Sequence, residues 1–109
     1  MKTQLKGKTF RPADLVAYAR DSIVSKTLVD RKAGTLTLFA FDRGQGLSEH
    51  VAPYDAVVEI LDGEALITIA GKKLHAKQGD LLIMPAHVPH ALKAVKKFKM
   101  LLIMIRGGK

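Results

Sequence analysis

The sequence predicts an all-β domain, an antiparallel β-barrel preceded by a short helix. Glycines punctuate the 109-residue chain at short intervals and separate apolar segments of strand length, as in hairpin-connected strands. These segments are rich in β-branched and aromatic residues, which favour strands. Because there is no internal repeat, low-complexity stretch or linker, we expect one domain over residues 1–109, with an arm and short helix over 1–21 and the barrel over 22–109.

Each element follows from its local sequence. Arg11-Pro12 leads into a short apolar segment, and proline is tolerated in the first turn of a helix, so we expect a helix over Pro12–Ala19. Gly34 marks a turn between the first two strands, and Gly71-Lys72 marks a tight hairpin. The expected strands cover residues 23–29, 35–41, 50–52, 56–61, 65–69, 73–75, 81–84, 88–92 and 98–105.

The last expected strand is apolar at nearly every position instead of alternating, so both of its faces should be buried. One set of its side chains would fill the barrel, namely Met100, Leu102 and Met104. The other set would pack on a second sheet, on another subunit or on the N-terminal segment, namely Leu101, Ile103 and Ile105.

Composition excludes several classes of function. The chain has no cysteine, which excludes thiolate metal sites, thiol nucleophiles and disulfides and fits a reducing cytoplasm. No apolar run is long enough to span a bilayer, and no apolar signal core follows the basic first residues. We therefore expect a cytoplasmic protein with no membrane contact.

The chain is strongly basic, with a formal charge of +8 and a pI near 9.9. Lysines gather near the C-terminus without interleaved aromatic rings, and no nucleic-acid-binding module is present. Bulk charge bears on solubility and association rates and does not define a site. We expect no nucleic-acid partner, and a role carried by the lysine surface alone is the last-ranked hypothesis.

Two stretches carry a paired motif. The first runs from Gly44 to Gly63 and contains His50, and the second runs from Gly79 through Pro85 to His90. Their spacing resembles the two motifs of the cupin family, G-x5-H-x-H-x3-E-x6-G and G-x5-P-x-G-x2-H-x3-N. The resemblance covers about residues 36–105 and implies a jelly roll, also called a double-stranded β-helix, and a homodimer.

The ligands that the family motif supplies are only half present. Ala52 stands at the second histidine of the first motif and Ala56 at its glutamate, while His87 and Ala94 replace the glycine and the asparagine of the second motif. The resemblance thus implies that two of four metal ligands survive, His50 and His90. The scaffold is better specified than the chemistry.

The inner wall of the predicted pocket is mostly apolar. Side chains alternate along a strand, so His50 and Ala52 should share one face, as should Ala56 and Val58 on the following strand. From the second motif, His90 and Leu92 should face the same cavity. The expected pocket residues are His50, Ala52, Ala56, Val58, His90 and Leu92.

Two functional hypotheses follow, and the residues leave open whether the chain is an enzyme. In the first, the two histidines anchor a small organic molecule in an apolar pocket, without a full metal site. In the second, one divalent transition-metal ion is held for oxygenase or isomerase chemistry, which requires a third ligand. That ligand would be His87, if its loop folds inward, or Glu49, if its strand is bulged.

Overall fold

The computed structural model describes residues 5–106 and contains one short helical turn and a set of antiparallel strands. The turn, η2, is a 3-10 helix over Pro12–Leu15. The strands are β1 (Ile23–Arg31), β2 (Gly34–Phe41), β3 (Gly46–His50), β4 (Asp55–Ile69), β5 (Lys72–Lys77), β6 (Leu81–Met84), β7 (His90–Lys93) and β8 (Phe98–Ile105). Within residues 5–106, no helix has the length and apolar character needed to cross a membrane.

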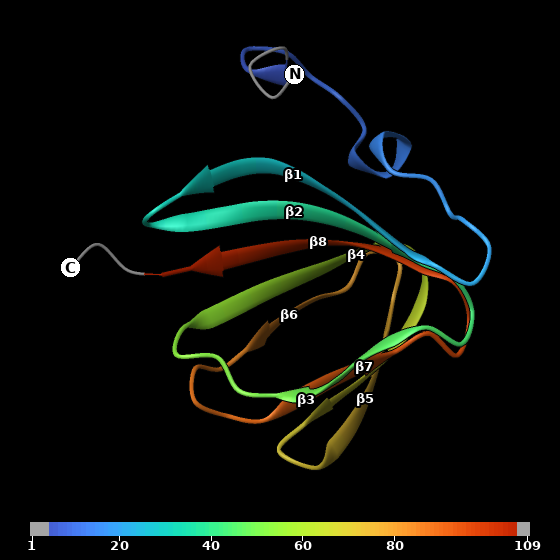
Figure 1. Ribbon diagram of the computed structural model, residues 1–109, viewed down its shortest axis with the longest axis vertical. Helices are drawn as coiled ribbons and strands as arrows, with labels where there is room; N and C mark the ends of the chain where they lie inside the picture. The colour runs from blue at the N-terminus through green and yellow to red at the C-terminus, as the bar shows by residue number, and fades with distance from the viewer. Residues whose placement is uncertain (1–4, 107–109) are drawn as a thin grey trace.

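The strands form two facing layers that share β4 (Figure 1). The first sheet has the order β1-β2-β8-β4-β6, and the second joins β5, β4, β7 and β3. This is the expected all-β barrel, a jelly roll. Loops 51–54 and 85–89 connect the two layers at one end, on the left of Figure 1. We call this end the barrel mouth.

Strand β4 passes from one sheet to the other by bending at Gly63. Its pairing with β8 shifts register between Ile60 and Asp62, and Gly63 then has a φ of 74°. A Cβ atom at Gly63 would clash with the backbone carbonyl of Lys97, so only glycine fits there. The separate strands predicted at 56–61 and 65–69 are therefore one continuous strand, because Gly63 bends the chain without ending the ladder.

The main core lies between the two sheets. Phe41 and Phe98 stack with ring centroids 4.5 Å apart at its closed end, and apolar residues of both sheets fill the rest. Met100 faces this core, and Leu102 and Met104 pack against it from the same strand. The inner set predicted for the last strand is thus observed.

The predicted helix at Pro12–Ala19 is wrong beyond its first turn. The 3-10 turn ends at Leu15, and Val16 adopts an extended conformation with φ −137° and ψ 136°. Val16 is 4% exposed, in a second cluster on the outer face of the first sheet that includes Leu38 and is packed against by Leu101. Burying Val16 there outweighs the continuation of a helix too short to be stable alone.

The N-terminal segment, residues 5–22, crosses the outer face of the first sheet and is held by polar contacts (Figure 1). The Tyr18 hydroxyl donates to Asp62 Oδ2 at 2.5 Å, and Lys99 Nζ donates to the Ala13 carbonyl at 2.7 Å. Burial, then the hydrogen bond to Asp62, raises the pKa of the Tyr18 phenol above its ordinary value. Of the outer set predicted for the last strand, Leu101 packs in the cluster beneath this segment, whereas Ile103 is half-buried and Ile105 is 53% exposed.

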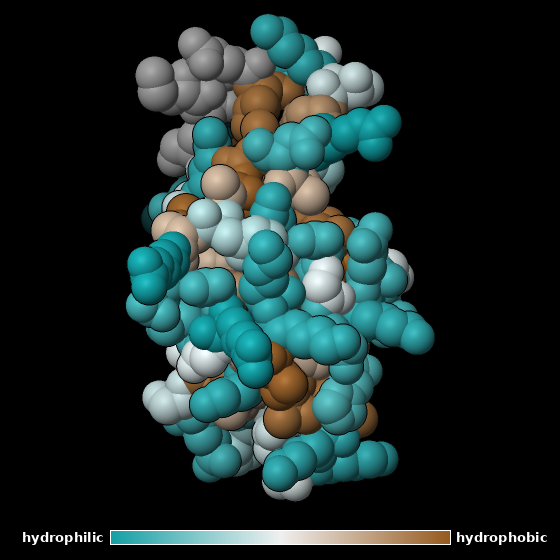
Figure 2. Space-filling model, turned by 90° about the vertical axis from the view of Figure 1, so that its right-hand side faces the viewer, coloured by the Kyte–Doolittle hydropathy of each residue, from teal (hydrophilic) through white to brown (hydrophobic). Residues whose placement is uncertain are grey.

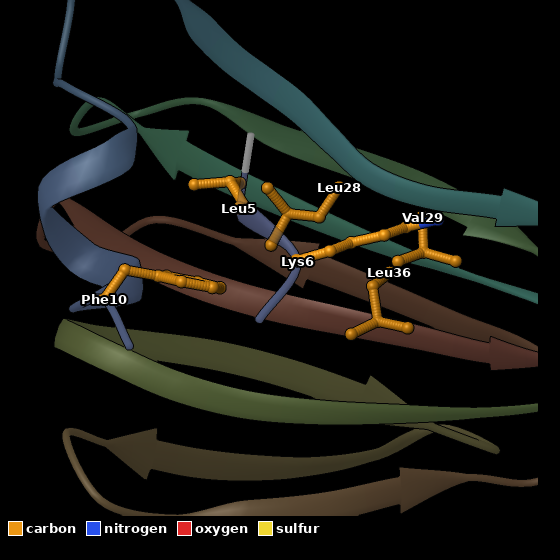
Figure 3. A pocket seen from close by; sticks show the side chains of 6 residues that line it. All are labelled: Leu5, Lys6, Phe10, Leu28, Val29 and Leu36. Atoms are coloured by element: carbon orange, nitrogen blue, oxygen red, sulfur yellow. The ribbon is translucent and has the colours of Figure 1, made fainter. Parts of the chain in front are cut away.

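The cover leaves a small apolar hollow between the N-terminal segment and the sheet. Figure 3 shows its lining, in which Leu5, Lys6 and Phe10 from the segment lie over Leu28, Val29 and Leu36 from β1 and β2. Its volume is about 130 Å³. The hollow lies outside the sheet and is therefore separate from the barrel interior.

Replacing Gly63 with alanine should test the bend. Both the positive φ and the clash with Lys97 oppose a side chain, so we expect Gly63→Ala to lower the free energy of unfolding by about 4 kcal/mol in urea titrations. Gly71 also has a positive φ but open space around it, so Gly71→Ala should cost about 1–2 kcal/mol. Equal losses in the two variants would show that the close approach to Lys97 is unimportant.

Candidate functional site

The two histidines predicted for the site lie side by side at the barrel mouth. His50 on β3 and His90 on β7 are directly opposite in the ladder, and their ring centroids are 4.3 Å apart at an interplanar angle of 73°. His90 is 3% exposed, whereas His50 is exposed to solvent. The pair therefore offers one buried and one accessible imidazole.

A bulge in β3 explains why His50 faces inward. Leu47 pairs with Leu92 and His50 pairs with His90, so β3 contains one more residue than β7 between these two rows. Residues three apart on a regular strand face opposite sides, but the extra residue of the bulge places His50 on the same face as Leu47. The bulge considered for Glu49 is present, and the Glu49 side chain is exposed.

Backbone carbonyls determine which imidazole nitrogens are free to accept a hydrogen bond or bind a ligand. His50 Nδ1 lies 2.8 Å from the Ser48 carbonyl oxygen, and His90 Nδ1 lies 3.1 Å from the Val88 carbonyl oxygen. Because a carbonyl can only accept, each Nδ1 must carry the proton and donate it. In the neutral rings the lone pair then resides on Nε2, which makes no hydrogen bond within residues 5–106.

The loops at the mouth are tied to each other. The His87 backbone N–H donates to the Ala52 carbonyl at 2.7 Å, and the Ala86 N–H donates to Asp55 Oδ1 at 2.8 Å. His87 has a φ of 64°, so a histidine occupies a left-handed conformation at the position where the motif has glycine. These contacts hold the ends of β3 and β6 at fixed positions beside β4 and β7.

The other predicted pocket residues are more deeply packed than the two histidines. Ala56, Val58 and Leu92 face inward, and their exposed fractions are 3%, 0% and 3%. Ala52 is half-buried in the loop after β3. Val58 and Leu92 therefore form the floor of the site as part of the core, and the accessible wall lies nearer the mouth.

Sequence reasoning placed Leu102 and Met104 inside the barrel but missed the other residues of the wall near the mouth. Leu47, Leu102 and Met104 pack against the inner core and remain only partly buried, whereas Phe39 lies deeper, where it pairs with Met100. Thr35 is 5% exposed, and its hydroxyl has no hydrogen-bond partner in the described chain. The alternation of β2 would also have placed Thr35 inside, but only the register shows that Thr35 pairs with Met104 at the open end.

The residues present do not fit the divalent metal that the family motif implies. No group of three or more histidine, aspartate or glutamate side chains that could hold an ion occurs within residues 5–106. His87 and Glu49, the two candidates for a third ligand, are both exposed and do not complete such a group around His50 and His90. A catalytic zinc or non-haem iron site requires three protein ligands, and here two imidazoles stand without a carboxylate.

Comparisons with family models and with solved structures point to the same family. The cupin domain model matches residues 37–106. A conserved Streptococcus pyogenes protein of unknown function is 38% identical, with a TM-score of 0.90 over 94% of this chain and 90% of that one. A cupin superfamily protein from Desulfitobacterium hafniense is 30% identical, with a TM-score of 0.88 over 94% of each chain. No curated protein matches the sequence significantly.

Restoring the missing ligands should create divalent metal binding. We expect Ala52→His with Ala56→Glu to raise the affinity for Zn²⁺ or Mn²⁺ in calorimetric titration by at least about 100-fold, since each added ligand should contribute about tenfold or more. The matched control is Val51→His with Val57→Glu, which places the same residue types at neighbouring positions that face away from the core. No difference between the two double variants would show that the motif register is misassigned.

Proposed function

This chain belongs to the cupin family, and we propose that it binds a small organic molecule at the barrel mouth, with His50 and His90 as polar anchors. The proposal does not require the divalent metal site of the family. The observation that carries it is the pair of Nε2 atoms left open by the carbonyl contacts of both Nδ1 atoms.

The chemistry of the mouth selects a class of ligand. A neutral imidazole with an open Nε2 accepts a hydrogen bond, so the polar group of the ligand should be a hydroxyl or another N–H or O–H donor. The partly buried side chains on the inner face near the mouth are apolar, including Leu47, Leu102 and Met104. Sites of this composition suit a ligand with one polar group and an apolar body.

The basic surface is proposed to take no part in this function and to bind no nucleic acid. Figure 2 shows the face at the opposite end from the mouth, where hydrophilic side chains cover most of the surface. A hollow there is lined by Arg43, Val95, Lys96 and Lys97. Lys97 Nζ lies 4.7 Å from the Tyr18 ring centroid, and Lys96 Nζ lies 4.0 Å from Glu64, so both also have partners within the chain.

We further propose that the protein is a homodimer. Strand β6 pairs only with β4 among the described strands, and its outward residues Leu81 and Ile83 are 60% and 57% exposed. Across the sheet, Ile83 continues into Val57 and Ile103 on the same outer face. An exposed apolar edge of this kind favours pairing with a second copy, which would cover it.

Phenol is a direct probe of the proposed site. In a metal-free buffer containing a chelator, we expect phenol to shift the NMR signals of the Met104 methyl group and the His50 ring. Loss of one hydrogen bond is worth about 1 kcal/mol, so His50→Ala should weaken phenol binding about five- to tenfold.

Anisole and an exposed histidine provide the controls. Anisole has the same ring without a donor and should bind the native protein about as weakly as phenol binds the His50→Ala variant. His75 is exposed on a hairpin beside Glu64, so His75→Ala should leave phenol binding unchanged. Equal affinities of the native protein for phenol and anisole would refute a polar anchor at the histidines.

The dimer is tested by sedimentation velocity. Placing a charge in the proposed interface should make association unfavourable, so we expect Ile83→Lys to shift the protein from dimer to monomer at micromolar concentration. Val95 is also apolar and 52% exposed but lies in the loop after β7, so Val95→Lys should leave the dimer intact. A native protein that sediments as a monomer would contradict the proposal.

A further inference from the structure

Two methionines flank the position where the family motif has its carboxylate. Ala56 pairs with Met104 on β8 and with Met84 on β6, and paired residues of neighbouring strands point to the same face. That face is the interior, because Ala56 and Met84 belong to the main core and Met104 packs against it. Met84 is 3% exposed and Met104 is partly buried.

The methionines and the histidines lie at the same end of the barrel. His50 is joined to the start of β4 by loop 51–54, and Met84 is joined to His90 by loop 85–89. These two loops are bonded to each other through His87 N–H and the Ala52 carbonyl. In Figure 1, the end of β6 and the start of β4 lie above the ends of β3 and β7 that meet at the mouth.

The row formed by Met84, Ala56 and Met104 faces the row formed by His50 and His90 across the barrel. His90 pairs with Ile69 in the second sheet, and Ile69 packs against the same core as the two methionines. Facing sheets lie about 10 Å apart, so side chains from both layers meet midway. Methionine has three rotatable bonds, which allows its sulfur to adjust toward a group opposite.

The combined donors are nitrogen and thioether sulfur without a carboxylate. Thioethers are soft ligands that select Cu(I), whereas divalent iron and manganese favour sites with carboxylates. We propose that the barrel mouth binds a single Cu(I) ion through Nε2 of His50 and His90 and the sulfurs of Met84 and Met104. This inference goes beyond the proposed function, because the ion would occupy the Nε2 atoms offered to an organic ligand.

Anaerobic titration of the full-length protein with Cu(I) against a competing chromogenic chelator tests this site. We expect one Cu(I) per chain and no comparable binding of Zn²⁺. Met84→Leu with Met104→Leu removes both sulfurs with little change in volume and should weaken Cu(I) binding by at least about 10–100-fold. Copper-edge X-ray absorption of the native complex should show sulfur among the ligands.

Met100 supplies the matched control. It lies deeper on the same strand, where it pairs with Ile60 and is fully buried, so Met100→Leu should leave Cu(I) affinity unchanged. Circular dichroism of each variant verifies folding. Unchanged Cu(I) affinity in the double variant, absorption showing only nitrogen and oxygen ligands, or the absence of stoichiometric Cu(I) binding would overturn the proposal. Phenol binding is measured with a chelator present, so its result is independent of the result for Cu(I).

Discussion

The fold depends on one strand that belongs to two sheets. Strand β4 contains 15 residues, and its bend at Gly63 turns the segment after it into the opposite layer. Without this bend, Ala56 and Ile69 would lie in one extended sheet and the main core would have no second wall. The same bend makes the row of Ala56 face the row of His90, so the architecture of the barrel and the composition of its mouth share one cause.

The sequence predicted the barrel because turn residues and β-branched segments are local signals. It also predicted that His50 and His90 would approach each other, because motif spacing specifies their strands. The helix after Leu15 was wrong because Val16 is buried by a tertiary contact on the sheet, which overrides local preference. Met104 was predicted to face the interior, but the placement of Met84 and Met104 on either side of Ala56 was missed because it depends on the register of three strands.

Loss of two motif ligands has not left an empty wall. At Ala56 the side chain is small, yet it is 3% exposed, since neighbouring strands contribute bulkier groups to the same layer. Protein interiors are close-packed, so a position that loses a long side chain is filled by those around it. Where the family motif supplies carboxylate and imidazole, the mouth of this barrel presents imidazole, thioether and hydrocarbon.

The N-terminal segment packs on the outer face of the first sheet, whereas the residues of the mouth lie on its inner face. Its contacts through Tyr18 and Val16 involve outward-facing residues, whereas the histidines and methionines face inward. The matched family region begins at residue 37, after β1 and this segment. Substitutions in the segment should therefore change the stability of the protein without changing the chemistry of the inner wall. Stability and binding chemistry are thus free to evolve independently.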